Sequence, residues 1–278
     1  MSTTFEAVQA QYEKNQKAVN SNKFSKEDRM KKYFFTLLAK GETSGERRVR
    51  IPPTKDGSTP FQEVFFHEIN VNGEWLKLYD PKQEGKRSPL NEVYDGLMLT
   101  GVESDKVLAR QYRARKFFIV KVIDRDNEAD GPKFWRFKNN TKKDGVFDKI
   151  YPLFKNKGDI TDPKDGRDLI ITLGLTTSGN GKEYTTITSI IPEDKSPLHE
   201  DPKVAEAWIN DDTVWSDVYS KKSEEYLELV ANGEVPKWDS EAKKFVSSTT
   251  EETTIMEPVE AEVDPQADEP SDSDQLPF

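Results

Sequence analysis

The chain has 278 residues, of which 34% are hydrophobic and 33% are charged, and it contains no cysteine. The absence of thiols excludes disulfides, thiol catalysis and Cys-ligated zinc or iron–sulfur sites. Two histidines, His67 and His199, leave little scope for histidine catalysis. No apolar run reaches the roughly 18 residues of a membrane span and no signal peptide follows Met1, so we expect a soluble cytoplasmic protein.

Charge is distributed unevenly along the chain. Residues 247–278 carry ten acidic side chains and no Lys or Arg, and they account for the whole net charge of −10. Residues 1–150 carry 29 basic and 22 acidic side chains (+7), whereas residues 151–246 carry 12 basic and 19 acidic ones (−7). A basic, aromatic-rich half followed by acidic segments indicates an anionic ligand, and nucleic acid is the first candidate.

Residues 1–23 are expected to form an N-terminal helical arm. Thr3 and Glu6 fit a capping box, and apolar side chains recur at helical spacing at Phe5, Val8, Tyr12 and Val19. Two roles remain open for this arm. It packs on its own domain as a surface helix, or it docks on a neighbouring protomer and supports cooperative binding.

Residues 24–246 are expected to form the folded core, with mostly strand signals between residues 33 and 200. Asn72-Gly73 and the segment 178–181 are hairpin turns. The pattern predicts strands at 49–51, 61–69, 75–79, 117–123, 133–138, 169–176 and 184–191. Several short strands separated by turns indicate a small barrel or sandwich.

Helical spacing replaces the strand pattern at about residues 201–233. Asp201-Pro202 is a typical helix start, and Gly233 is a plausible stop. The apolar residues of this segment would pack against the barrel. Residues 238–246 are expected to add a last hairpin.

The segment 110–118 combines four cations with three aromatic residues, and its candidates for DNA binding are Arg110, Tyr112, Arg113, Arg115 and Lys116. In a strand, Arg110 and Tyr112 would share one face and Arg113 and Arg115 the other. Cations follow phosphates while aromatic faces stack on unpaired bases. The alternative is a solvated basic edge strand beside core phenylalanines.

A second cluster at residues 133–138 supplies the candidates Trp135, Arg136, Phe137 and Lys138. Alternation places Arg136 and Lys138 on one face and Trp135 and Phe137 on the other, and spacing alone does not decide which face meets DNA. Three further DNA-binding candidates lie on an early strand, Arg47, Arg48 and Arg50. Single-stranded nucleic acid fits better than duplex, because no helix-turn-helix or basic helix is evident.

No cofactor or metal site is expected. The glycine-spaced segment 174–182 has Asn180 where a phosphate loop needs lysine, and it lies between two strands. The alternating acids from Asp124 to Asp130 have Ala129 where a calcium loop needs glycine. No carboxylate pair joins a nucleophile or base motif, so we expect no enzymatic activity.

Residues 247–278 are rich in acids and poor in large apolar residues, so we expect a disordered tail. Its tip joins two acids to an apolar end, and the candidate partner-binding residues are Asp272, Asp274, Leu276, Pro277 and Phe278. A terminal Phe with a free carboxylate is a compact anchor for one pocket of a partner protein. The alternative is a tail that only increases solubility.

Several segments, in the same order, resemble the T-even bacteriophage single-stranded DNA-binding (helix-destabilising) protein family. They are Arg47–Pro53 with Lys55-Asp56 and Pro60-Phe61, His67 with Asn72–Trp75, Phe118–Asp124, Phe134–Phe137 and Phe147–Ile150, within residues 24–235. The resemblance implies a β-rich (α+β) fold: a five-stranded OB-fold barrel with extra hairpins, C-terminal helices and the disordered acidic tail. By position, Arg50 resembles a phosphate contact, Arg110–Lys116 a basic strand lining the DNA cleft, and Trp135 a base-stacking tyrosine.

Three features depart from this family. Its zinc is held by one His and three Cys; His67 resembles the His, but residues 79–93 offer no Cys. We therefore expect no zinc and a loop held by packing of Pro81, Pro89, Leu90 and Tyr94. The arm has no cation before Lys14, which leaves its mode of cooperativity open. The ending Leu276-Pro277-Phe278 is more similar to the tail tip of bacterial single-stranded DNA-binding proteins.

The sequence thus predicts a protein that coats unwound DNA in phage replication, recombination and repair, in the host cytoplasm. It would bind cooperatively and recruit partner proteins through its tail. RNA remains possible as a ligand, because stacking and phosphate contacts do not require DNA. The alternative is an adaptor whose core binds protein and whose tail recruits replication machinery.

Overall fold

The computed structural model describes residues 26–38, 42–138, 145–177 and 183–248, together with Gln9 and Tyr12. Gln9 and Tyr12 have helical backbone conformation, and the rest of the N-terminal arm lies outside the described residues. In the described part of the chain, no helix combines the length and apolar character that crossing a membrane requires.

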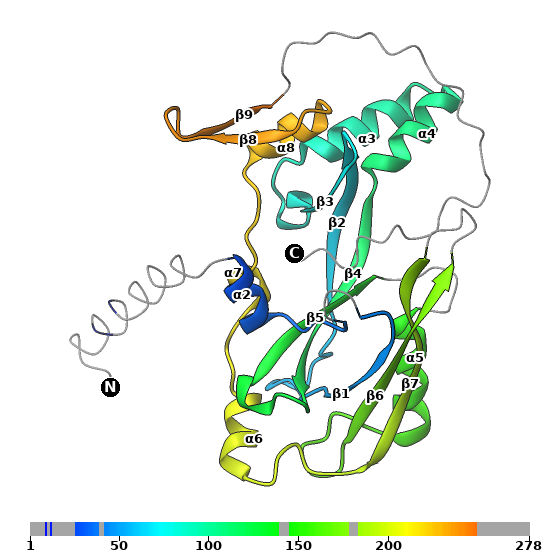
Figure 1. Cartoon of the computed structure of the whole chain (residues 1–278), viewed down its shortest axis with the longest axis vertical. Coiled ribbons are helices and arrows are strands. Elements are labelled where there is room, and N and C mark those ends of the chain that lie inside the picture. Colours follow the sequence, from blue (N-terminus) through cyan, green and yellow to red (C-terminus); the bar gives the residue numbers. More distant parts are fainter. Residues whose placement is uncertain are drawn as a thin grey trace.

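A seven-stranded antiparallel sheet forms the centre of the molecule, so the fold is β-rich with additional helices (Figure 1). Six strands follow the order β3-β2-β4-β1-β6-β7, and β5 pairs with β4 beside this path. The sheet is open, because the described pairings do not join its two ends. The strands are β1 (Gly45–Arg50), β2 (Gln62–Val71), β3 (Glu74–Tyr79), β4 (Ala114–Asp124), β5 (Pro132–Lys138), β6 (Arg167–Thr177) and β7 (Glu183–Lys195).

Strand β4 is the structural link of the molecule, because it pairs with three other strands. Its first half pairs with β2, from His67↔Ala114 to Gln62↔Ile119. Its last two residues pair with β1, and its opposite edge pairs with β5 from Phe117 to Ile123. Its side chains alternate between two buried clusters, which explains why the sequence reads as a nearly continuous apolar run.

Five strands, in the spatial order β5-β4-β1-β6-β7, contribute side chains to the largest buried cluster. Val49, Val120, Trp135, Ile171 and Ile190 represent the five strands in this core. Helix α5 (Val146–Lys157) lies between β5 and β6 in the sequence and covers the same core. Its apolar residues recur at helical spacing, so one face of the helix is buried.

The other face of β4 and β5 is covered by a second, smaller cluster of aromatic residues. Phe66, Phe117 and Phe134 come from β2, β4 and β5. Trp215 and Tyr219 pack on them from α7 (Trp215–Val218) and its C-terminal end, beside α2 (Lys26–Tyr33). The strands β4 and β5 are therefore sandwiched between two layers of side chains.

Residues 52–113, here called the insertion, join β1 to β4 and rise above the five strands (Figure 1). They contain the β2–β3 hairpin, the short 3-10 helix η1 (Pro81–Glu84) and the helices α3 (Pro89–Leu99) and α4 (Glu103–Tyr112). The hairpin turns at Asn72-Gly73, where both residues have positive φ, as this turn type requires. Leu78 and Leu90 of the insertion pack with Leu227 in a third buried cluster.

A second 3-10 helix, η2 (Glu128–Asp130), lies between β4 and β5. The C-terminal elements are α6 (Pro202–Ile209), α7, α8 (Glu224–Ala231), β8 (Pro236–Asp239) and β9 (Lys244–Ser247). The helix start at Asp201 is confirmed, because its side chain accepts a hydrogen bond from the Lys203 N–H at 2.9 Å. Gly233 has φ of 78° and ends α8, as predicted. β8 and β9 form the expected last hairpin, although β9 extends to Ser247, one residue into the expected tail.

The predicted strands between residues 49 and 191 are confirmed, and β2 pairs with β3 and β6 with β7, as the two hairpins require. The predicted turn at residues 178–181 lies outside the described residues. The sequence analysis missed three helices between residues 49 and 191, α3, α4 and α5. The expected strand at Arg110–Lys116 is partly wrong, because α4 continues to Tyr112 and β4 begins at Ala114.

Candidate nucleic-acid interface

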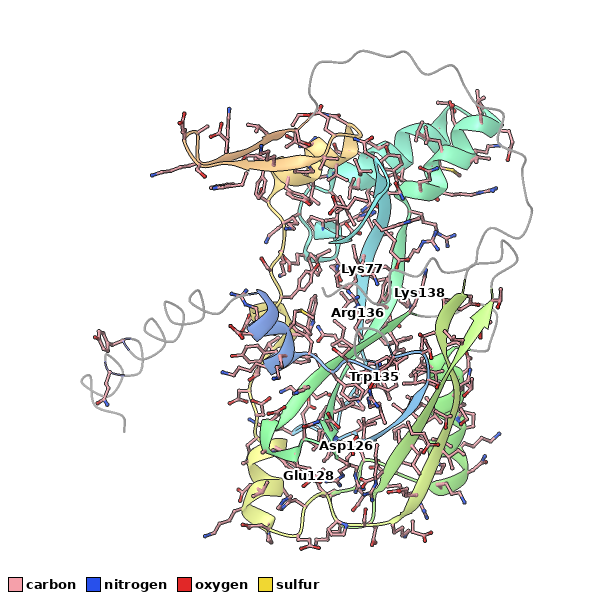
Figure 2. The ribbon with its side chains drawn as sticks, in the orientation of Figure 1. Lys77, Asp126, Glu128, Trp135, Arg136 and Lys138 are labelled. Carbon is pink, nitrogen blue, oxygen red and sulfur yellow. The ribbon has the colours of Figure 1, made fainter. Side chains whose placement is uncertain are left out.

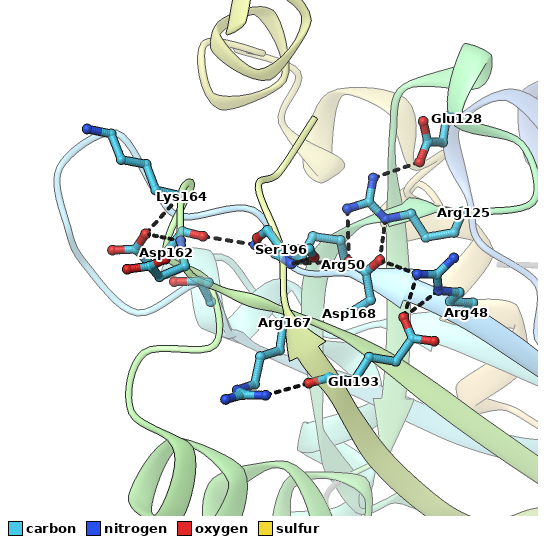
Figure 3. A network of polar contacts seen from close by, with 12 residues as sticks. Arg48, Arg50, Arg125, Glu128, Asp162, Lys164, Arg167, Asp168, Glu193 and Ser196 are labelled. Atoms are coloured by element: carbon cyan, nitrogen blue, oxygen red, sulfur yellow. Dashed lines mark hydrogen bonds and ion pairs between the residues drawn. The ribbon is translucent and has the colours of Figure 1, made fainter. Parts of the chain in front are cut away.

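Arg48 and Arg50 lie in a network of ion pairs centred on Asp168 of β6 (Figure 3). The Arg125 guanidinium donates to both Asp168 oxygens, at 2.8 and 2.9 Å. Arg50 Nη1 lies 3.2 Å from Asp168 Oδ1, and Arg48 Nη2 lies 3.2 Å from Asp168 Oδ2. Glu193 forms a further ion pair with Arg48, and Glu128 forms a further ion pair with Arg125.

Arg50 is a structural residue, and its buried side chain is not accessible to the phosphate contact that its position predicts. Its side chain is 0% exposed. It also donates to the backbone carbonyls of Asp162 and Ser196, both at 2.9 Å. Burial lowers the pKa of the Arg50 guanidinium, and the Asp168 carboxylate opposes part of this effect. These contacts join the end of β1 to the loops before and after β6 and β7.

Arg47 and Arg48 are accessible, but both are engaged by acidic side chains. Arg47 Nη2 donates to Glu42 Oε2 at 2.6 Å. Arg48 Nε donates to Glu193 Oε2 at 2.6 Å. A phosphate would have to displace these carboxylates, so the early strand is a weaker candidate than expected.

The basic segment 110–116 is divided between two elements. Arg110 is exposed on the last turn of α4, and the half-buried Tyr112 ends this helix. Arg113 follows as an exposed C-cap residue. Arg115 and Lys116 lie on opposite faces of β4, opposite Phe66 and Phe65 of β2 respectively. The segment therefore does not present one continuous row of cations.

The alternation predicted for β5 is confirmed, and the structure decides which row is buried in the main core. Trp135 is 1% exposed and packs edge-on against Phe35, with ring centroids 6.3 Å apart. Phe137 is buried beside it, with ring centroids 5.0 Å apart. Both side chains are buried in the main core, so neither Trp135, which resembles a base-stacking tyrosine by position, nor Phe137 presents an accessible ring to a base. Arg136 and Lys138 point to the opposite face of β5.

Four cations from three strands gather on that face near one carboxylate, Glu68 of β2. Figure 2 labels three of these cations, Lys77, Arg136 and Lys138. The strand register brings them together, since Glu68 pairs with Lys77, Phe66 with Arg115, and Phe117 with Lys138. We call this group the Glu68 cluster. Its members are Glu68, Lys77, Arg115, Arg136 and Lys138.

The Glu68 carboxylate holds three of these cations directly. Lys138 Nζ donates to Oε2 at 2.7 Å, Lys77 Nζ lies 3.5 Å from Oε1, and Arg115 Nε lies 3.8 Å from Oε2. Glu68 is nearly buried, with 8% of its side chain exposed, whereas 32% of Arg115 and 22% of Lys138 is exposed. The cluster therefore opens to solvent through Arg115 and Lys138.

The fourth cation, Arg136, lies over aromatic rings. Its guanidinium carbon is 5.2 Å from the ring centroid of Phe66 and 5.4 Å from that of Phe117. Lys77 Nζ lies 5.0 Å from the same Phe117 ring. Aromatic faces attract cations through the ring quadrupole, so these contacts help to keep two positive charges partly buried.

The charges of the cluster do not cancel. Burial alone would raise the pKa of Glu68, but the attraction of Lys138 and Lys77 outweighs it, so the pKa is lowered and the carboxylate is ionised at neutral pH. Counted over its five members alone, the cluster has four cations and one anion, a formal charge of +3. A concentrated positive charge that is partly open to water attracts anions.

Residues of the Glu68 cluster that sequence reasoning missed are Lys77 and Glu68. The Asn72-Gly73 turn contained the necessary information, because a two-residue hairpin loop sets the pairing of every residue on its two strands. That register places Glu68 opposite Lys77. The convergence with Arg115 and Lys138 depends on long-range pairing, which the turn does not specify.

His67 is buried in a polar network at the base of the insertion. Its Nδ1 donates to the Tyr112 carbonyl at 2.7 Å, and its Nε2 lies 3.5 Å from both Asp80 Oδ1 and Asn91 Nδ2. Asn91 Nδ2 donates to Asp80 Oδ1 at 2.8 Å. Of the residues expected to pack this loop, Pro89 and Leu90 are buried. Hydrogen bonds as well as packing therefore anchor α3.

Within the described ranges, no three His, Asp or Glu side chains are grouped in a way that would hold a metal ion. The predicted partner-binding residues of the tail, Asp272, Asp274, Leu276, Pro277 and Phe278, lie outside the described residues.

No protein-family model matches the chain, and no curated protein matches it in sequence.

Proposed function

We propose that this protein binds and coats single-stranded DNA and has no catalytic role. The observation that carries the proposal is the Glu68 cluster, whose four cations and one carboxylate have a combined formal charge of +3 on one face of β2, β3, β4 and β5. Cations that follow a flexible phosphate backbone supply most of the affinity of such proteins, independent of base sequence.

The strand order supports an OB-fold as the scaffold of this site. An OB-fold has five strands in the spatial order 3-2-1-4-5 and a helix between the third and fourth strands. In chain order β1, β4, β5, β6 and β7 would be the five strands, and their spatial order β5-β4-β1-β6-β7 and the position of α5 agree with that topology. The insertion would then be an enlarged loop between the first and second strands.

This assignment agrees with the position of the cluster. OB-folds bind oligonucleotides on the face of their second and third strands and on the loops that follow the first and fourth strands. Arg115 lies on β4, Arg136 and Lys138 lie on β5, and Lys77 lies in the insertion. In this assignment, all four cations would occupy the part of an OB-fold that meets nucleic acid.

The remaining segments complete the proposal. Residues 1–23 would contact a neighbouring protomer on DNA, and residues 249–278 would recruit proteins of replication, recombination and repair. The acidic tail also resembles a nucleic acid in charge, so it would compete with DNA for the cluster.

Because the described part of the structure offers no duplex-reading helix, unpaired DNA is the preferred ligand.

A fluorescence-anisotropy titration of labelled oligo(dT), with and without duplex competitor, tests the proposal. We expect binding that weakens with salt and resists the duplex. Lys138→Ala should weaken binding roughly three- to tenfold at low salt and reduce the log–log salt slope by about 0.7, because one phosphate contact is lost. Lys195→Ala is the matched control, since Lys195 is an exposed cation far from the cluster, 4.0 Å from Asp165.

Folded protein that fails to bind at low salt, with and without its tail, would remove the proposal. Equal losses for Lys138→Ala and Lys195→Ala would leave DNA binding in place but would remove the cluster as its site. Indifference to oligonucleotides combined with retained folding would make the adaptor function the better explanation.

A further inference from the structure

Glu68 occupies an unusual position for an acidic residue in a proposed phosphate-binding site. Its carboxylate lies at the centre of the cluster and contacts Lys138, Lys77 and Arg115. A site that only maximised attraction for phosphate would have a neutral residue here. The placement therefore needs an explanation in terms of binding, stability or both.

The surroundings of Glu68 are cationic from every strand that faces it. Lys77 faces it from β3, Arg115 from β4 and Lys138 from β5, and Arg136 lies on the same face over Phe66 and Phe117. Without the carboxylate, four partly buried cations would repel one another across a region of low dielectric. The carboxylate thus holds Lys77, Arg115 and Lys138 in place before any ligand arrives.

We propose that Glu68 is a built-in counter-ion that positions the cations of the cluster and deliberately limits the affinity for DNA phosphate. The inference rests on the proposed function. A phosphate oxygen that enters the cluster competes with the Glu68 carboxylate for Lys138 and Arg115, and the nearby negative charge opposes its entry. The same residue therefore stabilises the free protein and weakens the complex, which would allow bound DNA to exchange.

This dual role predicts opposite effects on stability and on binding. Glu68→Gln keeps the size of the side chain and removes its charge. We expect the melting temperature of the free protein to fall by roughly 4–10 °C, because the cations lose their counter-ion. We expect the dissociation constant for oligo(dT) to decrease roughly three- to tenfold at low salt, and the gain to shrink as salt screens it.

The matched control lies on the same strand. Glu63 is exposed on the opposite face of β2 and pairs with Lys116 of β4 at 2.8 Å. Glu63→Gln therefore makes the same chemical change in another β2–β4 ion pair outside the cluster. It should leave both the melting temperature and the affinity nearly unchanged, because exposed ion pairs contribute little.

The experiment measures thermal melting and oligo(dT) anisotropy for the full chain, Glu68→Gln, Glu68→Asp and Glu63→Gln at several salt concentrations. Glu68→Asp retains the charge and should keep the affinity close to that of the unchanged protein. A purely structural role for Glu68 would lower stability and affinity together. Unchanged or weaker binding by folded Glu68→Gln would therefore overturn the inference.

A second comparison guards against misfolding of Glu68→Gln. In a Lys77→Gln background one cation is already absent, so removal of Glu68 leaves three cations. Binding should still tighten from Lys77→Gln to the double variant, and failure to do so overturns the inference. If the unchanged protein does not bind at all, the proposed function fails first, which is distinguishable from failure of the role of Glu68.

Discussion

Trp135 and Lys138 stand three positions apart on β5 and have opposite environments. Trp135 is enclosed by the main core, whereas Lys138 reaches solvent beside Glu68. An aromatic residue can stack on a base only if a ring face is accessible, and the Trp135 ring faces Phe35 and Phe137 instead. The two side chains therefore contribute to different properties, stability and ligand binding.

Trp135→Phe separates these properties experimentally. We expect the affinity for oligo(dT) to change by less than about twofold, because the ring does not touch the proposed interface. The free energy of unfolding should fall by roughly 1–3 kcal/mol, because the smaller ring leaves a cavity. Denaturant unfolding and anisotropy titration measure the two quantities. A large loss of affinity at unchanged stability would restore Trp135 as a stacking residue.

Arg50 shows why cations are difficult to assign from sequence. Arg47, Arg48 and Arg50 are the same residue type and lie on the same strand, β1. The sequence alone therefore does not show which of them is free to bind a ligand. Arg48 and Arg50 pair with Asp168 or Glu193, which are more than one hundred residues away in the chain, whereas Arg47 pairs with the nearby Glu42. A cation in a sequence indicates phosphate binding only when no acid from a distant strand reaches it first.

At the scale of elements, the position of the N-terminal end of α3 depends on the polar network around Asp80. Asp80 Oδ1 accepts hydrogen bonds from the Lys82 N–H at 3.0 Å and from Asn91 Nδ2 at 2.8 Å. Burial alone would raise the pKa of Asp80, but the adjacent His67 ring and the hydrogen bonds from Lys82 N–H and Asn91 Nδ2 outweigh it and lower the pKa to about 2. The ionised form is therefore the one that anchors the helix.

This shift predicts a specific pH dependence. Because the folded-state pKa of Asp80 lies below its ordinary value of 3.8, its contribution to stability is present above about pH 4 and is lost as the pH falls toward 2. Asp80→Asn should reduce the free energy of unfolding by about 2 kcal/mol at pH 6, and the difference should shrink toward pH 2. Denaturant titrations at four or five pH values measure this difference.

Asp95→Asn is the control for the same helix. Asp95 is exposed on α3 and lies 3.7 Å from Lys82. Its replacement should have little effect at any pH, since the pair is accessible to water. A constant difference between the unchanged protein and Asp80→Asn across the pH range would contradict the assigned role.

Elements with local signals were predictable from the sequence, and those without were not. The β2–β3 hairpin has its Asn72-Gly73 turn, and α6 has its Asp201-Pro202 start. Helices α3 and α4 leave several apolar residues exposed, among them Leu99 and Leu108. An amphipathic pattern is weak when the helix rests on a hairpin rather than on a broad core.

At the scale of the whole molecule, the opposite charges of the cluster and the tail predict competition. Removal of residues 249–278 leaves β9 intact, because Ser248 N donates to the Val235 carbonyl at 2.9 Å and closes the last hairpin. We expect the truncated protein to bind oligo(dT) roughly threefold or more tightly at low salt. The two proteins should converge at high salt, where charge interactions are screened.

A full-length variant with the ten tail acids changed to Asn or Gln separates charge from chain length. It should bind as tightly as the truncated protein if competition is electrostatic. Equal affinities of the intact and truncated proteins at low salt would exclude competition between the tail and DNA.

The β-rich class, the hairpins and the C-terminal helices could be predicted from the sequence. The pairing of strands that are distant in the sequence could not. β4 pairs with β1, β2 and β5, and only the last of these neighbours is close in sequence. The cluster arises from these pairings, so its members Arg115 and Lys138 were identifiable as cations but not as neighbours. Which residues meet across a sheet is decided by tertiary structure.

The pairing of Val49 with Asp124 closes a long chain segment, and most of that segment is the insertion. Loop-closure entropy grows only slowly, by about 0.6 kcal/mol for each doubling of length, so the insertion can lengthen or shorten at little thermodynamic cost. Glu68 and Lys77 belong to the insertion, whereas Arg115, Arg136 and Lys138 belong to the strands below it. Evolution can therefore adjust the strength of the site by changing the insertion while the scaffold and its buried arginine network remain untouched.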